Sequence, residues 1–229
     1  MKLSIIIPVY NEAAHINELL FYLLKCTEKI KDVEILIVDG GSNDGTLNKI
    51  TPHNKIKSIC SGKGRGVQMN TGAKHANSDV LYFLHADSFP PPDFINLICS
   101  KINQGEKAGC FKMVFDWNHP WLKLAGWFTK FNVKFFRGGD QSLFVTKSLF
   151  ESIGGFDEHY PIFEDFTFIR ELYRRNIFCV IQKPIRSSSR RYKDNGIMIL
   201  QFHYWMLYLK KWCGVSSQGL VDYYQKFIK

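Results

Sequence analysis

The most constraining feature of this chain is an unbroken apolar and aromatic run, residues 80–84, that stops at His85 and Asp87. A run of this length bounded by polar residues is typical of a strand buried in a sheet. In open α/β sheets, ligands bind in the crevice beyond the carboxyl ends of the strands. The run therefore predicts a buried strand that places two side chains able to hold a cation at a sheet edge.

Segments typical of strands alternate with segments typical of helices along the first half of the chain. Strands are expected at residues 3–7, 33–38, 55–60 and 80–84, and helices at residues 11–25, 46–50, 66–76 and 93–102. Pro8 ends the first strand, and Asn11 is the expected N-cap of the first helix. This alternation implies an α/β fold with a mostly parallel sheet covered by helices on both faces.

Composition favours a globular protein with an anionic partner. The 229 residues are 45% apolar and 22% charged, without a low-complexity linker, and their net charge is +9. That charge suits a nucleotide diphosphate, an acidic lipid surface or nucleic acid. Nucleic acid is the weakest of these, because the acids at the strand ends would repel phosphate. The six cysteines include no CxxC pair, which argues against a zinc site. The apolar start is too short for a signal peptide, so a cytoplasmic protein is expected.

Two segments that end the first two expected strands carry acids on flexible loops. They are Ile5-Ile-Ile-Pro-Val-Tyr-Asn-Glu12 and Ile35-Leu-Ile-Val-Asp-Gly-Gly-Ser-Asn-Asp-Gly-Thr46. Asp39 and Asp44 are also ordinary turn and cap residues. Together, the two segments resemble the start of the glycosyltransferase family 2 proteins, which have the GT-A fold, a Rossmann-like sheet flanked by helices. The resemblance implies that Asp39 binds the base of a nucleotide sugar and that Pro8, Tyr10 and Glu12 line the nucleotide pocket.

A basic, glycine-rich loop at residues 62–66 precedes the third expected helix. Backbone donors and a helix N-terminus make such a loop a natural anion cradle, although a solvated basic loop has the same composition. The following residues, 64–73, resemble a segment of one bacterial branch of family 2. That resemblance gives Lys63 and Arg65 roles in binding the nucleotide sugar.

His85-Ala86-Asp87 takes the place of the family's Asp-x-Asp motif. The resemblance implies that Asp87 holds a divalent cation and that His85 and Ala86 line the nucleotide-sugar site. A histidine ligand would suit Mn²⁺ better than Mg²⁺, which prefers oxygen. His85 also has the alternative of hydrogen-bonding only to the ribose or to a neighbouring loop.

Two acidic segments further along complete the resemblance. Two glycines, the second of them Gly139, precede Asp140 and Gln141 and let the backbone come close to a sugar, whose hydroxyl groups Asp140 and Gln141 are expected to bind. The adjacent Glu164 and Asp165 precede a helical stretch, where first-turn acids also stabilise a helix. The resemblance implies that Asp165 is the general base, with Glu164 raising its pKa or orienting a loop.

The segment Ser187-Ser-Ser-Arg-Arg-Tyr192 is basic and rich in hydroxyl groups. Arginine matches the geometry of phosphate, so Arg190 and Arg191 are expected to bind the diphosphate of the donor. An exposed basic loop is the alternative. A comparable element occurs in the same bacterial branch, and the resemblance covers nearly the whole chain through Tyr192.

Two aromatic, basic stretches leave membrane contact open. A helix over Trp121–Arg137 would place apolar residues on one face and Lys123, Lys130, Lys134 and Arg137 opposite. Such a helix can lie on an anionic membrane or pack on the core with a solvated lysine face. Ile197–Leu209 presents the same choice and is shorter than the ~20 residues needed to span a bilayer.

The sequence as a whole predicts a metal-dependent glycosyltransferase that uses Mn²⁺ or Mg²⁺, and the resemblance implies inversion at the anomeric carbon. Its donor would be a nucleoside-diphosphate sugar, most commonly a UDP-sugar, and its acceptor a hydroxyl group, with a lipid-linked acceptor and the inner face of a membrane among the options. One domain is expected over residues 1–229: a donor half (1–115), an acceptor and catalytic half (116–195) and a C-terminal helical extension (196–229). The rivals are a GT-A-like binding protein without turnover and a sugar-phosphate nucleotidyltransferase.

Overall fold

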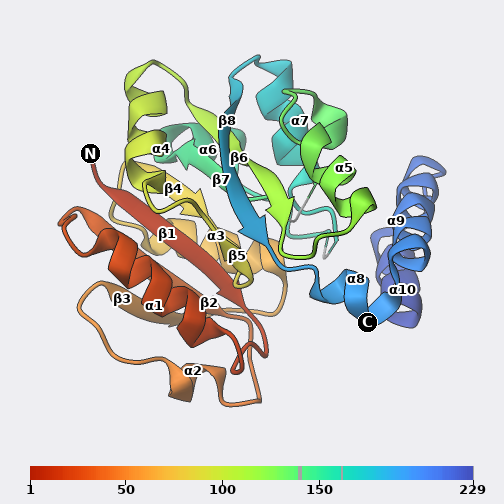
Figure 1. Ribbon diagram of the computed structural model, residues 1–229, viewed down its shortest axis with the longest axis horizontal. Coiled ribbons are helices and arrows are strands. Elements are labelled where there is room, and N and C mark those ends of the chain that lie inside the picture. The colour runs from red at the N-terminus through yellow and green to blue at the C-terminus, as the bar shows by residue number, and fades with distance from the viewer. Residues whose placement is uncertain (139–140, 161, 229) are drawn as a thin grey trace.

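The computed structural model describes residues 1–138, 141–160 and 162–228, and its centre is one curved sheet (Figure 1). Among these residues the strands are β1 (Leu3–Val9), β2 (Val33–Asp39), β3 (Ile56–Cys60), β4 (Val80–Phe83), β5 (Ser88–Phe89), β6 (Ala108–Phe115), β7 (Leu143–Thr146) and β8 (Phe178–Ser187). Their order across the sheet is β3-β2-β1-β4-β7-β6-β8-β5. The protein therefore has the α/β fold that the alternation of segments predicts.

The first half of the sheet is parallel and the second half is mixed. β1 pairs in parallel with β2 and β4, and β2 pairs in parallel with β3. β7 then runs antiparallel to both of its neighbours, β4 and β6. Because β1, β2, β3 and β4 run in the same direction, their carboxyl ends lie at the same edge of the sheet.

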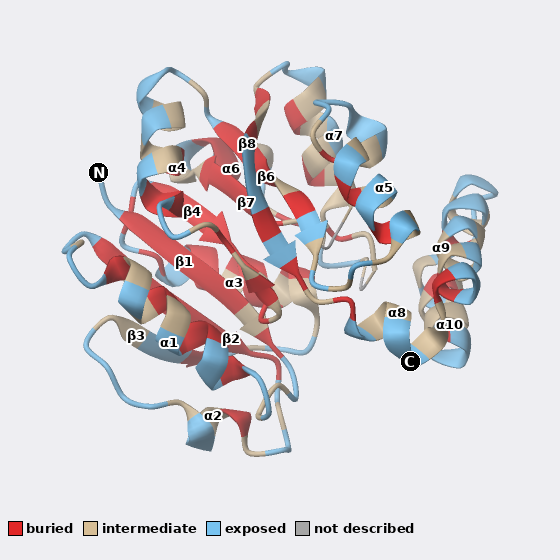
Figure 2. Cartoon of the chain, viewed as in Figure 1, coloured by how far each residue is buried: buried red, intermediate tan, exposed pale blue. Residues whose placement is uncertain are grey.

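Helices cover both faces of the sheet. The described helices are α1 (Ile16–Thr27), α2 (Thr46–Lys49), α3 (Arg65–His75), α4 (Phe94–Asn103), α5 (Pro120–Phe128), α6 (Lys147–Ile153), α7 (Phe166–Arg174), α8 (Arg190–Asn195), α9 (Ile197–Trp212) and α10 (Ser217–Phe227), with a 3₁₀ turn η1 (Lys134–Phe136). One apolar core lies between the sheet and α1 with α4, and a second lies between the sheet and α3, α6 and α7. Figure 2 shows these buried layers in red along the strands.

Alternation of side chains explains how one buried strand serves both cores. In β1, Ile5 and Ile7 belong to the core under α1, whereas Ile6 belongs to the core under α3. Side chains of successive strand residues point to opposite faces, so a strand covered on both sides must be apolar throughout. The continuous run in β1 is therefore the expected signature of its central place.

The first helix begins later than the sequence predicts. Asn11 is not its N-cap, because α1 starts at Ile16 and is preceded by His15. Asn11 instead has a positive φ of 55° and its side-chain oxygen accepts a hydrogen bond from Asn43 N at 3.0 Å. The asparagine therefore shapes the loop after β1 and leaves the helix to begin one turn later.

The second half of the sheet contains two strands that the sequence pattern does not predict. β6 and β8 pair in parallel, with an irregularity between Phe111 and Lys112. The partner stretch of β8 includes Pro184, which cannot donate to a ladder and is usual only at edges or bulges. This interruption hides the alternation by which such a strand would be recognised.

The aromatic stretch after residue 120 is not one helix. α5 ends at Phe128, and residues up to Arg137 form loops and the short turn η1. Arg137 is also buried and does not lie on a solvated lysine face. Its guanidinium donates to the backbone oxygens of Thr129 and Phe131, which hold this segment against the sheet.

Helices α8 to α10 lie to one side of the sheet (Figure 1) and share a small core of their own. Leu200 and Leu207 of α9 pack there with Leu220 of α10. Phe163, from the loop before α7, packs against the same group. In the described part of the chain, every helix falls short of the length and apolar character that crossing a bilayer requires.

Candidate active site

The carboxyl ends of β1 and β2 are joined by a buried glutamine. Gln68, on α3, donates from its amide nitrogen to the backbone oxygens of Val9 and Val38 at 2.7 and 2.8 Å. A buried amide with two carbonyl partners is fully used as a donor and fixes the spacing of the two strand ends. Sequence reasoning assigns no role to Gln68, although a polar residue on the sheet-facing side of α3 is a signal that could have found it.

Asp39 ends β2 and organises its own turn. Its carboxylate accepts hydrogen bonds from Gly41 N at 3.1 Å, from Ser42 N at 3.0 Å and from the Ser42 hydroxyl. The side chain is almost completely buried. Asp39 is therefore held rigidly at the edge of the sheet where the sequence predicts a ligand.

Asp44 has the turn and cap role that the sequence leaves open. Its carboxylate accepts from Thr46 N and Ala13 N, both at 3.0 Å, and from the Thr46 hydroxyl. The hydrogen bond from Thr46 lowers the pKa of Asp44 below its usual range. The loop after β2 is thus tied to the loop after β1.

Two pairs of predicted site residues meet beyond the end of β1. Lys63 Nζ lies 3.2 Å from the Tyr10 hydroxyl and 4.3 Å from the centre of its ring. Arg190, at the start of α8, lies 3.3 Å from Glu12 Oε1. Glu12 Oε2 is buried without a hydrogen-bond partner among the described residues. Pro8 lies one residue before the end of β1. The basic turn at residue 190 therefore closes over the loop after the first strand, 178 residues away in sequence.

Arg65 reaches the predicted catalytic pair. Its Nε lies 3.4 Å from Glu164 Oε1, and the Glu164 side chain is only 4% exposed. A buried carboxylate needs such a partner, because an unpaired buried charge is strongly unfavourable. In this conformation Arg65 therefore neutralises Glu164, a contact that the sequence does not predict.

The end of β4 meets the basic turn through the backbone. Ser188 N donates to the Asp87 backbone oxygen at 3.1 Å, and the short strand β5 after Ala86 and Asp87 pairs with the end of β8. Asp116 fixes the next residue by accepting from Ser189 N and from its hydroxyl. Burial opposes ionisation of Asp116, but the hydrogen bonds from Ser189 outweigh it and lower its pKa. Arg190 and Arg191 follow directly, so the predicted metal and diphosphate residues are neighbours.

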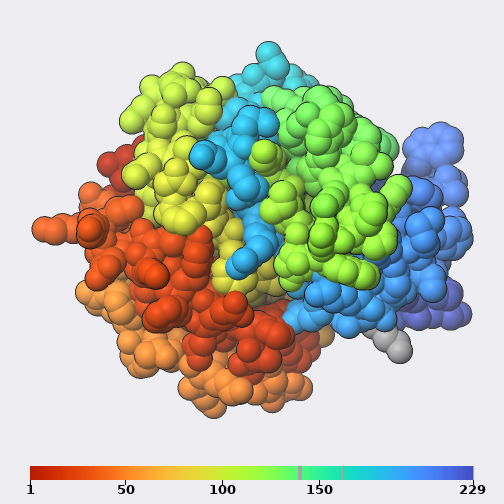
Figure 3. All heavy atoms as spheres, viewed as in Figure 1, coloured from red at the N-terminus to blue at the C-terminus, as the bar shows by residue number. Residues whose placement is uncertain are grey.

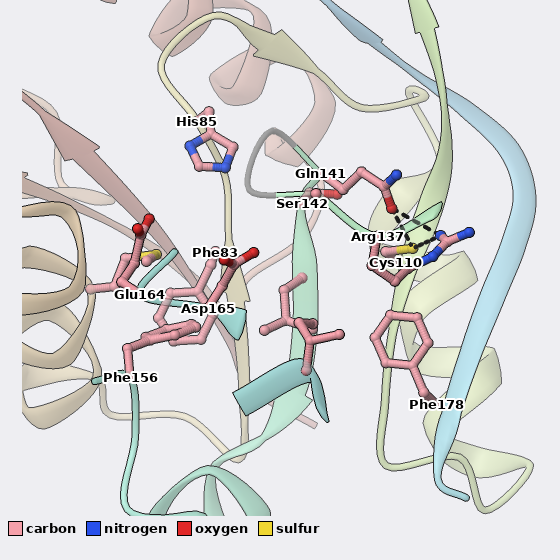
Figure 4. A pocket seen from close by; sticks show the side chains of 14 residues that line it. Phe83, His85, Cys110, Arg137, Gln141, Ser142, Phe156, Glu164, Asp165 and Phe178 are labelled. Atoms are coloured by element: carbon pink, nitrogen blue, oxygen red, sulfur yellow. Dashed lines mark hydrogen bonds between the residues drawn. The ribbon is translucent and has the colours of Figure 1, made fainter. Parts of the chain in front are cut away.

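A pocket lies between β4, β7 and the start of α7 (Figure 4). His85, Glu164 and Asp165 line one side, and Arg137 and Gln141 line the other. The centre of a water molecule can occupy about 30 Å³ of it, so the pocket has room for water.

The far wall of the pocket is a buried arginine whose partners among the described residues are all neutral groups. Arg137 donates to Gln141 Oε1 at 2.9 Å and to Cys110 Sγ at 3.0 Å (Figure 4). Burial raises the pKa of the Cys110 thiol to about 11, although the charge of Arg137 opposes the shift. Cys110 is therefore a neutral packing residue, and Gln141 is held in place from the backbone of Phe136 as well.

Asp165 lies directly before α7, and a lysine from the C-terminal helices reaches its loop. Lys211 Nζ lies 3.8 Å from the centre of the Phe166 ring, 4.3 Å from that of Phe163 and 5.2 Å from that of Tyr160. Burial lowers the pKa of Lys211 to about 8, while the charge of Asp165 opposes the shift. Sequence reasoning misses Lys211, because 46 positions separate it from Asp165.

A buried asparagine anchors the other end of the same loop. Asn70, on α3, donates to the Phe156 backbone oxygen and to Glu158, and accepts from Phe156 N at 2.9 Å. Gly155 has a positive φ of 76°, and a Cβ there would lie 2.7 Å from Asn70 Oδ1. Only glycine fits this position without displacing the asparagine. Asn70 and Lys211 thus hold the segment before Asp165 at its two ends.

Gly139 and Asp140, two of the predicted sugar-contacting residues, lie outside the residues that the structure describes. The remaining predicted residues fall into two groups at the same sheet edge. The strand-end loops and α8 bring together Tyr10, Glu12, Lys63 and Arg190, with Asp39 held in the loop after β2. His85, Gln141, Glu164 and Asp165 line the pocket.

Sequence comparison decides the family. The family model described as Glycosyl transferase family 2 matches residues 4–208, which is most of the chain. The chain belongs to glycosyl transferase family 2. This family member is also 31% identical over 112 residues to the undecaprenyl-phosphate 4-deoxy-4-formamido-L-arabinose transferase of Enterobacter sp. (strain 638). That match covers 45% of this chain and 34% of the relative, so it spans about a third of the relative's length.

Solved structures share the fold of this family 2 protein. S. aureus TarS, in complex with UDP, superposes with a TM-score of 0.66 at 21% identity over 82% of this chain and 60% of that one. The mannosyltransferase PcManGT from Pyrobaculum calidifontis, in complex with GDP-Man and Mn²⁺, gives 0.65 at 20% identity over 98% and 63%. These neighbours confirm the GT-A type of fold.

The donor set at the end of β4 of this family 2 protein would suit a metal ion that takes most of its ligands from elsewhere. Within the described ranges, no three His, Cys, Asp or Glu side chains are grouped to hold a metal by themselves. Mg²⁺ and similar ions at phosphate sites commonly use one or two carboxylates and take their other ligands from phosphates and water. Asp87, next to the arginines that begin α8, suits this arrangement.

Proposed function

We propose that this glycosyltransferase moves a sugar from a nucleoside-diphosphate donor to an acceptor hydroxyl group with inversion, and that it requires a divalent metal. The observation that carries the proposal is the convergence of His85, Glu164 and Asp165 on one pocket at the carboxyl edge of the sheet. In this proposal residues 1–115 supply most of the donor site, and residues 116–195 supply the catalytic side.

The donor site that we propose lies over the loops after β1 and β2. Asp39 would bind the base, and Glu12 Oε2, buried and without a hydrogen-bond partner among the described residues, would accept from a ribose hydroxyl. Lys63 and Tyr10 form the outer wall, and Arg190 with Arg191 would bind the diphosphate. TarS has also been solved in complex with UDP-GlcNAc, which supports a UDP-sugar as the first donor to test.

The chemical step that we propose is a single in-line displacement. The acceptor oxygen bonds to the anomeric carbon while the bond from that carbon to the diphosphate oxygen breaks, and Asp165 takes the hydroxyl proton. A divalent metal held by Asp87, with His85 as a candidate second contact, would withdraw charge from the leaving nucleoside diphosphate. The Mn²⁺ of the PcManGT complex supports a test with Mn²⁺ and Mg²⁺.

For the acceptor, we propose only the reacting group, a hydroxyl. The name of the Enterobacter relative contains an undecaprenyl phosphate. A lipid-linked acceptor met at the cytoplasmic face of a membrane is therefore a reasonable extension of the proposal. A sugar-phosphate nucleotidyltransferase is disfavoured, because such enzymes carry a glycine-rich basic loop after the first strand, where this chain has Pro8–Glu12.

The decisive experiment is donor hydrolysis across a panel of nucleotide sugars with Mn²⁺, with Mg²⁺ and with chelator. We expect one sugar to be hydrolysed only when metal is present. Asp165→Asn should lower turnover by about 10²–10⁴-fold while calorimetry still detects donor binding. Glu171→Gln, which alters a half-buried carboxylate that pairs with Arg174 and Arg175 on the same helix, is the matched control.

The metal role is tested separately with Asp87→Asn. We expect this variant to need at least about tenfold more Mn²⁺ for half-maximal turnover, the usual scale for a weakened metal site. Asp93→Asn, a carboxylate just before α4, should leave the metal requirement unchanged. Unchanged turnover in both Asp87→Asn and Asp165→Asn would show that the assigned roles are wrong.

A further inference from the structure

Helix α9 is apolar on two opposite faces. Leu200 and Leu207 are buried on one face. The opposite face carries an exposed stripe in which the residues recur at intervals of four and three: Met198, Phe202, Trp205, Leu209 and Trp212. Their exposed fractions run from 48% for Leu209 to 84% for Trp212. A helix that is apolar all round is normally covered on all sides, so the outer stripe is suited to a partner.

The stripe continues onto α5 and the loop that follows it. The rings of Trp121 and Trp205 pack edge to face, with centres 6.5 Å apart. Beyond Trp121, the exposed apolar side chains are Leu124, Trp127, Phe131, Val133 and Phe135. We name the α9 stripe together with Trp121 and these residues the aromatic face. Figure 3 shows the green spheres of the α5 region beside the blue spheres of α9 at one end of the molecule.

Every charged residue in the two segments that form the aromatic face is basic. Residues 117–137 and 196–221 contain Lys or Arg but no Asp or Glu. Lys123 and Lys134 are exposed, and Lys130 Nζ lies 3.9 Å over the Trp127 ring. Lys210 Nζ lies 4.9 Å from the centre of the Tyr223 ring. The surface therefore combines exposed aromatic side chains with a positive border.

Exposed aromatic side chains with a border of lysines indicate which kind of partner the aromatic face binds. Tryptophan and tyrosine concentrate at the boundary between lipid tails and water, and lysines beside them are attracted to anionic headgroups. A second copy of this chain would bring two positive borders together, which opposes pairing of the same face. We propose that the aromatic face docks the protein on an anionic lipid bilayer, with α9 and α5 lying in the plane of the interface.

Vesicle sedimentation tests the proposal without any assumption about the reaction. The probes are vesicles of phosphatidylcholine mixed with phosphatidylglycerol and vesicles of phosphatidylcholine alone. The parent protein should sediment with the anionic vesicles, less so at high salt because salt screens the lysines. Fluorescence of the tryptophans should shift to shorter wavelength when the vesicles are added.

A pair of variants with a matched control assigns the binding to the aromatic face. Trp205→Glu combined with Trp212→Glu should weaken binding to the anionic vesicles by about tenfold or more. Phe21→Glu changes a side chain that is 75% exposed on α1, at the far end of the molecule (Figure 1), and should bind as the parent does. Circular dichroism and donor hydrolysis in solution should be the same for all three proteins.

Lysine variants separate the two attractions. Lys130→Gln combined with Lys134→Gln should remove most of the preference for phosphatidylglycerol and leave the weak binding to phosphatidylcholine. The proposal is overturned if the parent ignores anionic vesicles, or if Phe21→Glu loses binding as strongly as the tryptophan pair. A dimer seen in sedimentation velocity and abolished by the tryptophan pair, without vesicle binding, would assign the face to a second copy instead.

Discussion

The loops after β1 and β2 differ from the C-terminal helices in how their side chains are satisfied. Around β1 and β2, polar side chains satisfy one another: Asp39 bonds to Ser42, Asp44 to Thr46, and Gln68 to both strand ends. Around α9, apolar side chains such as Trp205 and Trp212 remain exposed on the surface. The first region is completed by the chain itself, whereas the second presents a surface that nothing in the described chain covers.

The difference teaches where each region draws its stability. A buried polar group destabilises the folded state unless it is paired, so a change in the loops after β1 and β2 or in Gln68 should lower the free energy of unfolding. Exposed apolar groups contribute little to the folded state, so a change on the aromatic face should spare folding and affect only association. Each of the following variants would sharpen or break this contrast.

The largest effect is expected at Gln68. Gln68→Met keeps the volume of the side chain but removes the amide that donates to the carbonyls of Val9 and Val38; of the two, Val9 O keeps a second donor, Gly40 N at 3.0 Å. We expect the free energy of unfolding to fall by about 2–4 kcal/mol, since a lost hydrogen bond costs about 0.5–1.5 kcal/mol and a buried group left unsatisfied about 1–3 kcal/mol. Urea denaturation measures the change, and Gln104→Met, at an exposed site, is the control. A fall of the same size in both variants would break the contrast.

The next largest effect on stability is expected at Gly154 and Gly155, two adjacent glycines with positive φ in the loop that leads to Asp165. Gly154→Ala meets open space, so it should cost only the backbone strain of about 1 kcal/mol. Gly155→Ala also drives a Cβ into Asn70 Oδ1, 2.7 Å away, and should cost roughly twice as much. Thermal unfolding of the two variants gives the comparison. If both variants lost the same stability, the Asn70 side chain would have moved aside at little cost.

A smaller, pH-dependent effect is expected at Lys211. Burial lowers its pKa to about 8, below the 10.5 of an exposed lysine, so between these values the unfolded chain binds the extra proton. The contribution of Lys211 to stability therefore rises as pH increases from 8 to 10.5. The groups that act on it are Asp165, Asp157, Glu164 and Arg170. Lys211→Met should lack this rise, which urea titrations at pH 7.5, 9 and 10.5 would reveal by difference. If the free energy of unfolding changed with pH in the same way for the parent and for Lys211→Met, the lowered pKa of Lys211 would be contradicted.

The smallest effect on folding is expected at Trp212. Its side chain is 84% exposed, so Trp212→Gln should change the free energy of unfolding by no more than about 0.5 kcal/mol. The Leu207→Ala variant, in the small core between α9 and α10, is the comparison and should be clearly destabilised. A large loss in Trp212→Gln would mean that the aromatic face supports the fold.

The sequence predicts the features that depend on local pattern. The strand at residues 80–84 and the alternation before it suffice for the α/β fold, and motif resemblance places Glu164 and Asp165 together at the start of α7. Contacts between distant segments leave no such pattern. The pairing of Arg65 with Glu164 depends on how α3 packs, and the burial of Arg137 depends on carbonyl groups that any sequence could supply.

Helix α9 bears the aromatic face on one side and, on another, the lysine that sits against Phe163 and Phe166. If the aromatic face docks on a bilayer as proposed, one helix would join the membrane contact to the segment that carries Asp165. The orientation of that segment relative to the bilayer would then be set by the same contact that holds the protein at the surface.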